Sequence, residues 1–346
     1  MITALSVFRP CVRRRASAAA LLFVMTAAAS AQPGAAPTKA KGNPPPPRVP
    51  AGVVAHRDLA YVADGHDRQK LDLYLPEKSA GPLPVIVWVH GGGWQGGSKN
   101  QCRPLADGFV ARGYAVASIG YRLSGDAIFP AQLEDCKAAV RWLRAHARDH
   151  GLDPARFAAW GSSAGGHLVA LLGTTGDVPD FDVGAHRDQP SRVQAVVDWF
   201  GPTDFNQMDR HAPPGAGLKH DAPTSPESKL IGAPIADPAN RAKVRRADPV
   251  AYVSAGDPPF LVMHGDADAT VPHHQSVLLH DALAAAGVPV RFVTLAGAGH
   301  GTGGFGTPAA AELVASFLDH RLKGADTAAA RWPAASRATL AAAAPR

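Results

Sequence analysis

The sequence predicts an α/β protein with a mostly parallel central sheet, helices on both faces of that sheet, and a cap insertion. From residue 84 onward, short apolar runs without alternation recur along the chain, and such runs are typical of strands that are covered on both faces. Most of these runs are separated by gaps long enough for a helix, as right-handed crossover connections require. One run, 157–160, leads directly into a glycine-flanked serine and then into a helical pattern.

The individual elements follow from these runs and from the stretches between them. We expect an antiparallel pair to open the sheet, because 53–61 and 71–75 flank a turn at Asp64-Gly65 and the second of them alternates cleanly. The buried strands are expected at 85–89, 115–119, 157–160, 195–199, 260–263 and 290–295. The helices are expected at about 101–112, 130–150, 164–173, 273–286 and 307–322.

Residues 1–31 have the pattern of a secretory signal peptide. Arg13-Arg14-Arg15 precede the apolar run 16–29, which ends in the small residues Ala29-Ser30-Ala31. This run is shorter than the roughly 18 residues that a membrane span needs. We therefore expect cleavage after Ala31 and a secreted or periplasmic protein without a membrane anchor. Cleavage removes four arginines and no acidic residue, so the formal charge of +6 becomes +2, and no basic cluster remains that would indicate nucleic-acid binding.

The mature chain divides into a linker, one domain and a tail. Residues 32–51 are rich in proline and predict an extended linker, and 52–322 form the folded domain. Within the domain, 202–258 separate two core strands by far more than a normal loop, and a helix is expected around Ser225–Ile231. Apolar anchors favour an ordered cap over the carboxyl ends of the strands, although a disordered surface loop is the alternative. Residues 323–346 are alanine-rich without periodicity and predict a disordered tail.

The segment Gly161-Ser162-Ser163-Ala164-Gly165 has the pattern of a nucleophile elbow centred on Ser163. A strand-to-helix turn this sharp leaves no room for side chains two places before and after the serine, which explains the two glycines. The helix that follows directs its N-terminal amides, including that of Ala164, toward the site where negative charge would develop on an attacked carbonyl.

A second glycine-rich segment, His90-Gly91-Gly92-Gly93-Trp94, directly follows the expected strand 85–89. Successive small residues let backbone amides converge on one point, so the amides of Gly92, Gly93 and Ala164 could together bind the oxyanion of a tetrahedral intermediate. A tight structural turn is one alternative. A phosphate cradle is another, although neither G-x-G-x-x-G nor G-K-[ST] follows. We expect His90 to brace the loop by a hydrogen bond.

An acid and a histidine follow the serine in the chain. The strand 260–263 ends in His264-Gly265-Asp266-Ala267-Asp268, so either carboxylate could orient a histidine at this edge of the sheet. Of 15 histidines, His300 alone lies on a glycine-flanked loop between the last strand and the last helix. Serine, aspartate and histidine in this order are characteristic of α/β-hydrolases.

These motifs, with Asp198-Trp199-Phe200-Gly201-Pro202 and His264 to Pro272, resemble the α/β-hydrolase family of bifunctional feruloyl and acetylxylan esterases, which is related to the hormone-sensitive-lipase-like esterases. The resemblance covers about residues 55–322. It implies that Asp268 is the acid, with Asp266 its neighbour, and that Ser163, Asp268 and His300 form a catalytic triad. It also implies ester hydrolysis through an acyl-enzyme on acetyl or feruloyl esters of plant polysaccharide, with neither a metal nor an organic cofactor.

Other functions remain as alternatives. A broad short-chain carboxylesterase or lipase-like enzyme would use the same residues. A serine peptidase of the prolyl-oligopeptidase type shares the His-Gly-x-x-Asp-x-x-Val-Pro string, but about 50 residues before the first strand are too few for its propeller. A non-enzymatic binding protein on the same fold is the remaining class.

Two cysteines, Cys102 and Cys136, remain after cleavage of the signal peptide. An exported protein could bridge them. Two buried thiols are the alternative, and no cysteine spacing indicates a metal site.

Overall fold

The computed structural model describes residues 44–341, so the expected signal peptide and most of the expected linker lie outside the described residues. The strands are β1 (Val53–Ala60), β2 (Lys70–Pro76), β3 (Leu83–Val89), β4 (Ala115–Ile119), β5 (Leu152–Ser162), β6 (Ala195–Trp199), β7 (Phe260–Gly265), β8 (Val290–Leu295) and β9 (Ala335–Leu340). In this part of the chain they form one sheet in the order β1-β2-β4-β3-β5-β6-β7-β8-β9. β2 pairs antiparallel with β1 and β4, and all other pairs are parallel. The predicted α/β class and its leading antiparallel pair are confirmed.

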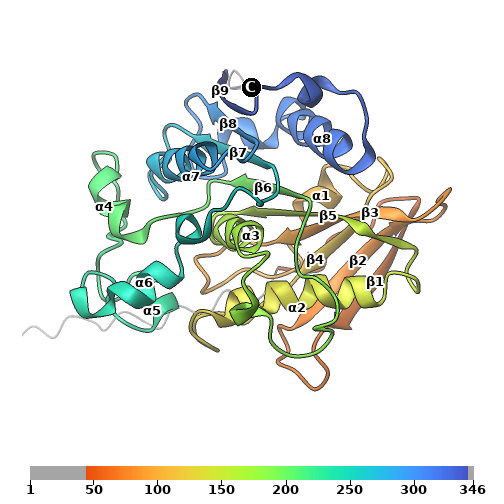
Figure 1. Ribbon diagram of the computed structural model, residues 1–346, viewed down its shortest axis with the longest axis horizontal. Helices are drawn as coiled ribbons and strands as arrows, with labels where there is room; N and C mark the ends of the chain where they lie inside the picture. Colours follow the sequence, from red (N-terminus) through yellow and green to blue (C-terminus); the bar gives the residue numbers. More distant parts are fainter. Residues whose placement is uncertain (1–43, 342–346) are drawn as a thin grey trace, which may run out of the picture. The chain divides into compact units, whose positions relative to one another are not determined.

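Helices cover both faces of the sheet (Figure 1). The longer ones are α2 (Ala131–Ala145), α3 (Ala164–Thr174), α7 (His274–Ala285) and α8 (Pro308–Lys323), and α1 (Arg103–Ala106) is a single turn. Side chains of β3 alternate between two apolar clusters. Val85, Val87 and Val89 pack in the cluster that holds residues of α2, α3 and α7. Ile86 and Trp88 pack in the cluster that holds residues of α1 and α8. Both faces of the central strands are therefore buried, which is why their sequence lacks alternation.

Two expectations about the elements need correction. The helix expected at 101–112 is reduced to α1, because Gly108 adopts a φ of +77° that an α-helix cannot continue through. The tail expected to be disordered, 323–346, instead contributes β9, which pairs in parallel with β8 along its whole length. Alternate residues of β9 are exposed, as on an edge strand with one neighbour, so the sequence carries no apolar run there.

The insertion 202–258 contains the short helices α4 (Met208–His211), α5 (Pro226–Ile231) and α6 (Arg241–Arg246). Ser225 caps α5 by accepting a hydrogen bond from the Ser228 amide at 3.0 Å. Six apolar residues of the insertion are buried in the same cluster as α2 and α3: Phe205, Leu230, Ile231, Ile235, Val244 and Ala247. His167 of α3 also donates from Nε2 to the Ala247 carbonyl at 2.7 Å. The insertion thus packs directly against the helix that follows Ser163.

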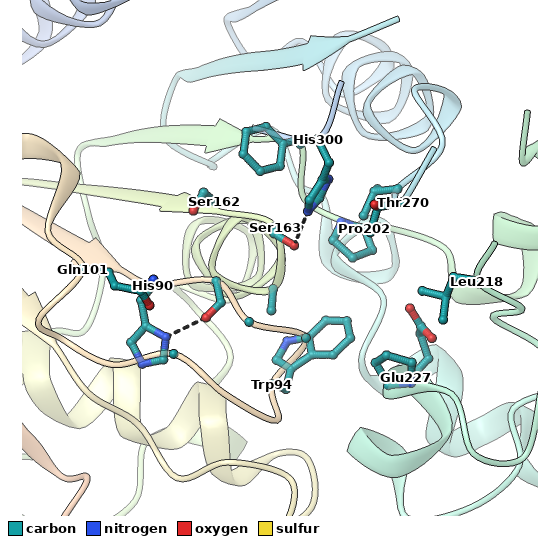
Figure 2. Close-up of a pocket in the computed structure, with 18 of the residues that line it drawn as sticks. His90, Trp94, Gln101, Ser162, Ser163, Pro202, Leu218, Glu227, Thr270 and His300 are labelled. Carbon is teal, nitrogen blue, oxygen red and sulfur yellow. Dashed lines mark hydrogen bonds between the residues drawn. The ribbon is translucent and has the colours of Figure 1, made fainter. Parts of the chain in front are cut away.

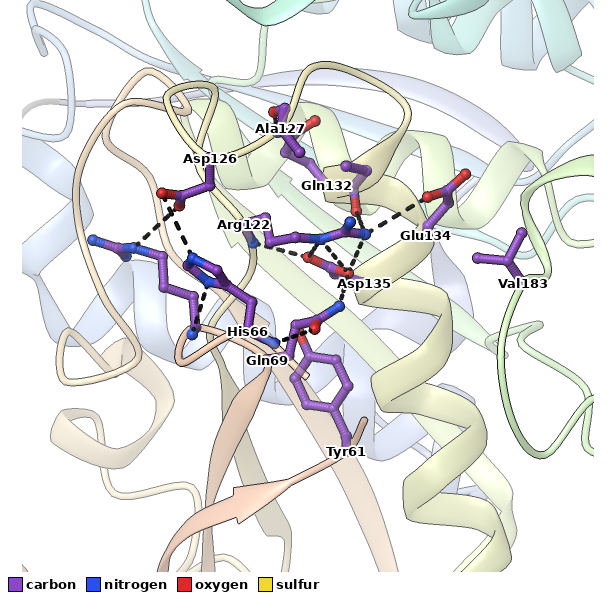
Figure 3. A network of polar contacts seen from close by, with 12 residues as sticks. Tyr61, His66, Gln69, Arg122, Asp126, Ala127, Gln132, Glu134, Asp135 and Val183 are labelled. Carbon is purple, nitrogen blue, oxygen red and sulfur yellow. Dashed lines mark hydrogen bonds and ion pairs between the residues drawn. The ribbon is translucent and has the colours of Figure 1, made fainter. Parts of the chain in front are cut away.

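A buried polar network fixes α2 against the start of the domain (Figure 3). The Asp135 side chain is almost completely buried, and it accepts hydrogen bonds from Arg122 Nη2 at 2.7 Å and from Gln69 Nε2 at 2.7 Å. Tyr61 donates from its hydroxyl to the Gly120 carbonyl at 2.7 Å. Because each charge has partners, its burial is tolerated, and the network connects β1, β2, the loop after β4 and α2.

Cys102 and Cys136 are both buried and form no disulfide in the structure. Cys102 belongs to the apolar cluster on the α8 side of the sheet and Cys136 to the cluster on the α2 side. The sheet itself separates the two thiols. None of the helices between residues 44 and 341 combines the length and the apolar character that a bilayer span requires.

Candidate active site

The strained turn at Ser163 joins β5 to α3. Ser163 has φ +54° and ψ −123°, a conformation that non-glycine residues rarely adopt and that is typical of functional positions. A Cβ atom at Gly161 would lie 2.3 Å from the Gly165 carbonyl oxygen, and one at Gly165 would lie 2.1 Å from the Val89 carbonyl oxygen. The Ser163 amide donates to the Trp199 carbonyl at 2.9 Å, which holds the turn against β6. The two glycines are therefore steric requirements of the turn.

Ser163, His300 and Asp268 form a continuous hydrogen-bonded chain. The His300 ring lies with Nε2 at 2.9 Å from Ser163 Oγ and with Nδ1 at 2.7 Å from Asp268 Oδ2. Because a carboxylate only accepts, Nδ1 carries the proton and Nε2 is left to accept from the serine hydroxyl. Phe200 packs edge-on against the imidazole with ring centroids 4.7 Å apart. This is the arrangement in which a serine hydroxyl can be activated as a nucleophile.

Asp268, and not Asp266, faces His300. The other Asp268 oxygen, Oδ1, accepts from the amides of Thr270 at 2.8 Å and Val271 at 2.9 Å. The Asp266 carboxylate is exposed and accepts from the Gly297 amide at 2.6 Å. The structure thus separates two carboxylates that are only two residues apart in the sequence.

A second histidine, His264, also contacts Asp268, and no pattern in the sequence indicated this contact. His264 is fully buried, with Nε2 at 2.9 Å from the Val271 carbonyl oxygen and 3.3 Å from Asp268 Oδ2. A carbonyl only accepts, so Nε2 carries a proton, and Nδ1 accepts from the Ser276 hydroxyl at 2.7 Å. Burial would raise the pKa of Asp268, but the hydrogen bonds from His264 and His300 hold it well below its usual value. The carboxylate that faces His300 therefore stays ionised.

The glycine loop after β3 places free amides beside Ser163. Gly92 and Gly93 have φ values of +119° and +57°, and a Cβ at Gly92 would lie 2.4 Å from the Gly96 carbonyl oxygen. Neither amide donates to a backbone carbonyl within residues 44–341, and both glycines line the same cavity as Ser163. Ala164 is the first residue of α3, where amides have no partner in the helix, and it lines that cavity too. All three residues expected in an oxyanion hole are thus brought together.

His90 braces this loop, as expected. Its Nδ1 donates to the Gly91 carbonyl at 2.7 Å, and its ring stacks on Tyr121 with centroids 4.4 Å apart. Burial lowers the pKa of His90 to about 4, so the ring is neutral at physiological pH. The Tyr121 hydroxyl donates to the His90 carbonyl at 2.9 Å, which secures the loop from its other side.

The cavity in front of Ser163 has a volume of about 450 Å³ and lies between the glycine loop and the insertion (Figure 2). The insertion supplies five of its lining residues: Pro202, Leu218, His220, Pro226 and Glu227. A second hollow of about 380 Å³ shares Ser162 and Phe200 with the first and is lined further by Trp199 and Phe305. The second hollow therefore adjoins the catalytic cavity, whereas Ser163 itself lines the first. Within residues 44–341, no group of three or more His, Cys, Asp or Glu side chains is arranged to hold a metal ion.

Comparison with known proteins agrees with the esterase class that this fold and site indicate. The chain is 32% identical to esterase LipC of Mycobacterium tuberculosis over 291 residues, which are 80% of this chain and 70% of LipC. A truncated carbohydrate esterase from gut microbiota superposes with a TM-score of 0.68 at 31% identity, covering 78% of this chain and 96% of that one. A bifunctional GH43-CE protein of Bacteroides eggerthii gives a TM-score of 0.70 at 33% identity over 78% of this chain, which spans only 35% of that longer protein. The protein is a carboxylic ester hydrolase of the α/β-hydrolase fold.

The family model BD-FAE matches residues 71–283, and the chain belongs to that family. The match extends from β2 into α7 and so includes Ser163, Asp268 and the glycine loop, while His300 follows it in the chain. The resemblance expected from the sequence motifs is confirmed.

Proposed function

We propose that the protein is an exported serine esterase that hydrolyses acetyl or feruloyl esters of plant polysaccharide through Ser163, His300 and Asp268. The observation that carries the mechanism is the unbroken chain from Asp268 Oδ2 through the His300 ring to Ser163 Oγ, with contacts of 2.7 and 2.9 Å. Each donor in this chain faces an acceptor.

In the proposed reaction, His300 Nε2 takes the hydroxyl proton as Ser163 Oγ attacks the ester carbonyl. The amides of Gly92, Gly93 and Ala164 bind the oxyanion, and one such donor is worth about 3 kcal/mol of transition-state stabilisation. Asp268 stabilises the imidazolium, which then protonates the leaving alcohol. Water then attacks the acyl-enzyme while His300 takes a proton from the water. His300 afterwards returns the proton to Ser163 Oγ, and the acid and free Ser163 are released.

Three observations support a polysaccharide ester as substrate. The family resemblance implies this activity, and two similar structures are described as a carbohydrate esterase and a bifunctional GH43-CE protein. In addition, a second hollow adjoins the catalytic cavity and offers room for a further part of the substrate. A broad short-chain carboxylesterase is the second candidate, favoured by the similarity to LipC. One methylene of the acyl group changes the free energy by which an enzyme discriminates between two substrates by only about 1–3 kcal/mol. A preference for short acyl groups is therefore weak evidence for one of the two candidates over the other.

A substrate panel on the protein lacking residues 1–31 tests the proposal, with Ser163→Ala as the matched control. We expect p-nitrophenyl acetate to be hydrolysed faster than p-nitrophenyl decanoate, with release of acetate from acetylxylan or of ferulate from methyl ferulate. Ser163→Ala should abolish all of these activities while the circular dichroism spectrum is unchanged, because the hydroxyl is not needed for the turn. Turnover by Ser163→Ala would refute the mechanism. A preference for decanoate without release from either natural substrate would refute the substrate assignment.

Export is tested separately. The full-length chain is expressed in a bacterial host, and the product is recovered from the periplasm or the medium and sequenced from its N-terminus. We expect the mature chain to begin at Gln32. Recovery of uncleaved protein from the cytoplasm alone would contradict the proposal.

A further inference from the structure

A buried carboxylate of the insertion lies at the wall of the catalytic cavity. Glu227 is the second residue of α5, and both Glu227 and its neighbour in space, His220, line the cavity in front of Ser163. Figure 2 shows Glu227 across the cavity from Ser163, beside Leu218. The side chains of His220 and Glu227 are only 2% and 3% exposed. Burial of a carboxylate at this depth is costly unless partners compensate for it, and nothing in the proposed reaction uses Glu227.

One Glu227 oxygen has a partner and the other has none. His220 Nδ1 donates to Glu227 Oε1 at 2.8 Å. Burial acts to lower the pKa of His220, but Glu227, Asp209 and the Thr270 carbonyl together raise it above its ordinary value. Glu227 Oε2 is buried and has no hydrogen-bond partner within residues 44–341. An ionised carboxylate oxygen can only accept, so this atom requires a donor.

The chemistry of the surroundings limits which donor fits. His220 Nδ1 already donates to Oε1, so Oε2 is the oxygen of this carboxylate that still lacks a donor. Of the neighbouring cavity wall, Leu218 and Pro226 have no side-chain donor, and the Trp94 indole N–H forms no hydrogen bond to Oε2 or to any other group within residues 44–341. The terminal torsion of a glutamate is soft, so a small rotation turns Oε2 toward a group in the cavity while Oε1 stays near His220. A hydroxyl group of the substrate meets these conditions.

We propose that Glu227, held by His220, is a specificity-determining residue that accepts a hydrogen bond from a hydroxyl group of the ester substrate. The inference rests on the proposed function, because it takes Ser163 as the point of attack and the cavity as the substrate site. Two sources of the hydroxyl are chemically equivalent for Glu227. One is the phenolic hydroxyl of a feruloyl-type acyl group, and the other is a sugar hydroxyl of the alcohol.

Two pairs of esters distinguish these sources, because the members of each pair differ in hydroxyl groups. Methyl 4-hydroxycinnamate and methyl cinnamate test the acyl side. A monoacetylated xylopyranoside and cyclohexyl acetate test the alcohol side. For each pair, the ratio of kcat/KM for the hydroxylated ester to that for the hydroxyl-free ester is measured in the wild type and in Glu227→Gln.

We expect one of the two ratios to fall about tenfold in Glu227→Gln, mainly through KM, since a charged acceptor is replaced by a neutral amide whose carbonyl must face His220. Glu77→Gln is the matched control, because Glu77 is exposed at the start of the loop after β2 and should leave both ratios unchanged. If Glu227→Gln does not fold, Glu227→Asp serves instead, and its shorter side chain should lower the same ratio.

Two results would overturn the inference: no preference for the hydroxylated ester in either pair of the wild-type enzyme, or equal ratios in the wild type and the Glu227 variants. Neither result touches the proposed mechanism, which fails only if Ser163→Ala retains activity. The two failures are therefore distinguishable.

Discussion

The structure allows a specific prediction for the substitution of Asp268, because both oxygens of this carboxylate already accept hydrogen bonds. Oδ1 accepts from two backbone amides, of Thr270 and Val271, and Oδ2 faces His300 Nδ1 and His264 Nε2. The substitution Asp268→Asn replaces one of these oxygens by an NH₂ group, which only donates. In either orientation of the asparagine amide, the NH₂ group therefore faces N–H donors that it cannot accept from.

The two orientations have different costs. If the amide nitrogen faces Thr270 and Val271, both backbone amides lose their acceptor, at a cost of about 1–3 kcal/mol for the buried Val271 amide and less for the partly buried Thr270 amide. If it faces His300, the imidazole must take its proton on Nε2 in order to accept at Nδ1, and Nε2 can then no longer accept the proton of Ser163. The second orientation keeps the bonds of both backbone amides, and His264 Nε2, which the NH₂ group would also face, retains the Val271 carbonyl as its acceptor, so we expect this orientation to prevail. The rate should then fall by about 10⁴, the loss measured for this substitution in a well-studied serine protease triad.

The assay is hydrolysis of p-nitrophenyl acetate, with kcat measured for Asp268→Asn and for Asp266→Asn as the matched control. The Asp266 carboxylate is exposed and accepts only from the Gly297 amide, so its substitution should change kcat no more than about twofold, as for other surface positions. Circular dichroism checks that both variants are folded. A larger loss in Asp266→Asn than in Asp268→Asn would refute the reasoning and assign the acid to Asp266.

Two further substitutions and one deletion test other parts of the structure. Gly165→Ala should cost at least about 3 kcal/mol of the free energy of unfolding or prevent folding, because its Cβ would lie 2.1 Å from the Val89 carbonyl oxygen, whereas Gly81→Ala, with no atom within 4 Å, should be tolerated in the same denaturant titration. Burial raises the pKa of Asp198 to about 7, so Asp198 destabilises the folded state increasingly as pH rises from about 4 to 7 and constantly above that range. Asp198→Asn should therefore gain about 2–4 kcal/mol over the wild type at pH 8 and little at pH 4, and a gain that is independent of pH would contradict this account. Deletion of the chain after Lys323 removes β9, so the thermal midpoint should fall by several degrees with esterase activity retained at 25 °C, and an unchanged midpoint would show that the pairing of β9 with β8 adds no stability.

Much of the fold could be predicted from the sequence, because the central strands are buried on both faces. Residues such as those of β3 must be apolar at every position, and a continuous apolar run is visible without knowledge of the tertiary structure. β9 shows the limit of this reasoning. At an edge it has one neighbouring strand and alternate exposed residues, so Ala335–Leu340 resembles the irregular sequence on its N-terminal side.

The insertion shows a second limit. Its helix α5 could be located from the proline after Ser225 and from the apolar residues Leu230 and Ile231, since capping and burial are local signals. The position of Glu227 in the catalytic cavity could not be predicted, because it depends on how the insertion packs on α3 and on the loop after β7. The contact between His220 and Glu227 joins residues seven apart whose pairing no periodicity indicates.

Residues whose identity the backbone geometry requires could be recognised from the order of amino acids alone. Gly161 and Gly165 flank Ser163 because a side chain at either position would clash with a backbone carbonyl. Only glycine meets this requirement, so the turn can be recognised from the two glycines in the sequence. The family resemblance had already indicated Asp268 over Asp266, but the physical reason for this choice is visible only in the tertiary structure. Both carboxylates follow the same strand, and what distinguishes them is the direction in which the loop turns: the Thr270 and Val271 amides hold Asp268 inward against His300, while Asp266 faces solvent. Contacts between segments far apart in the chain make that difference, and the order of residues along one segment does not encode them.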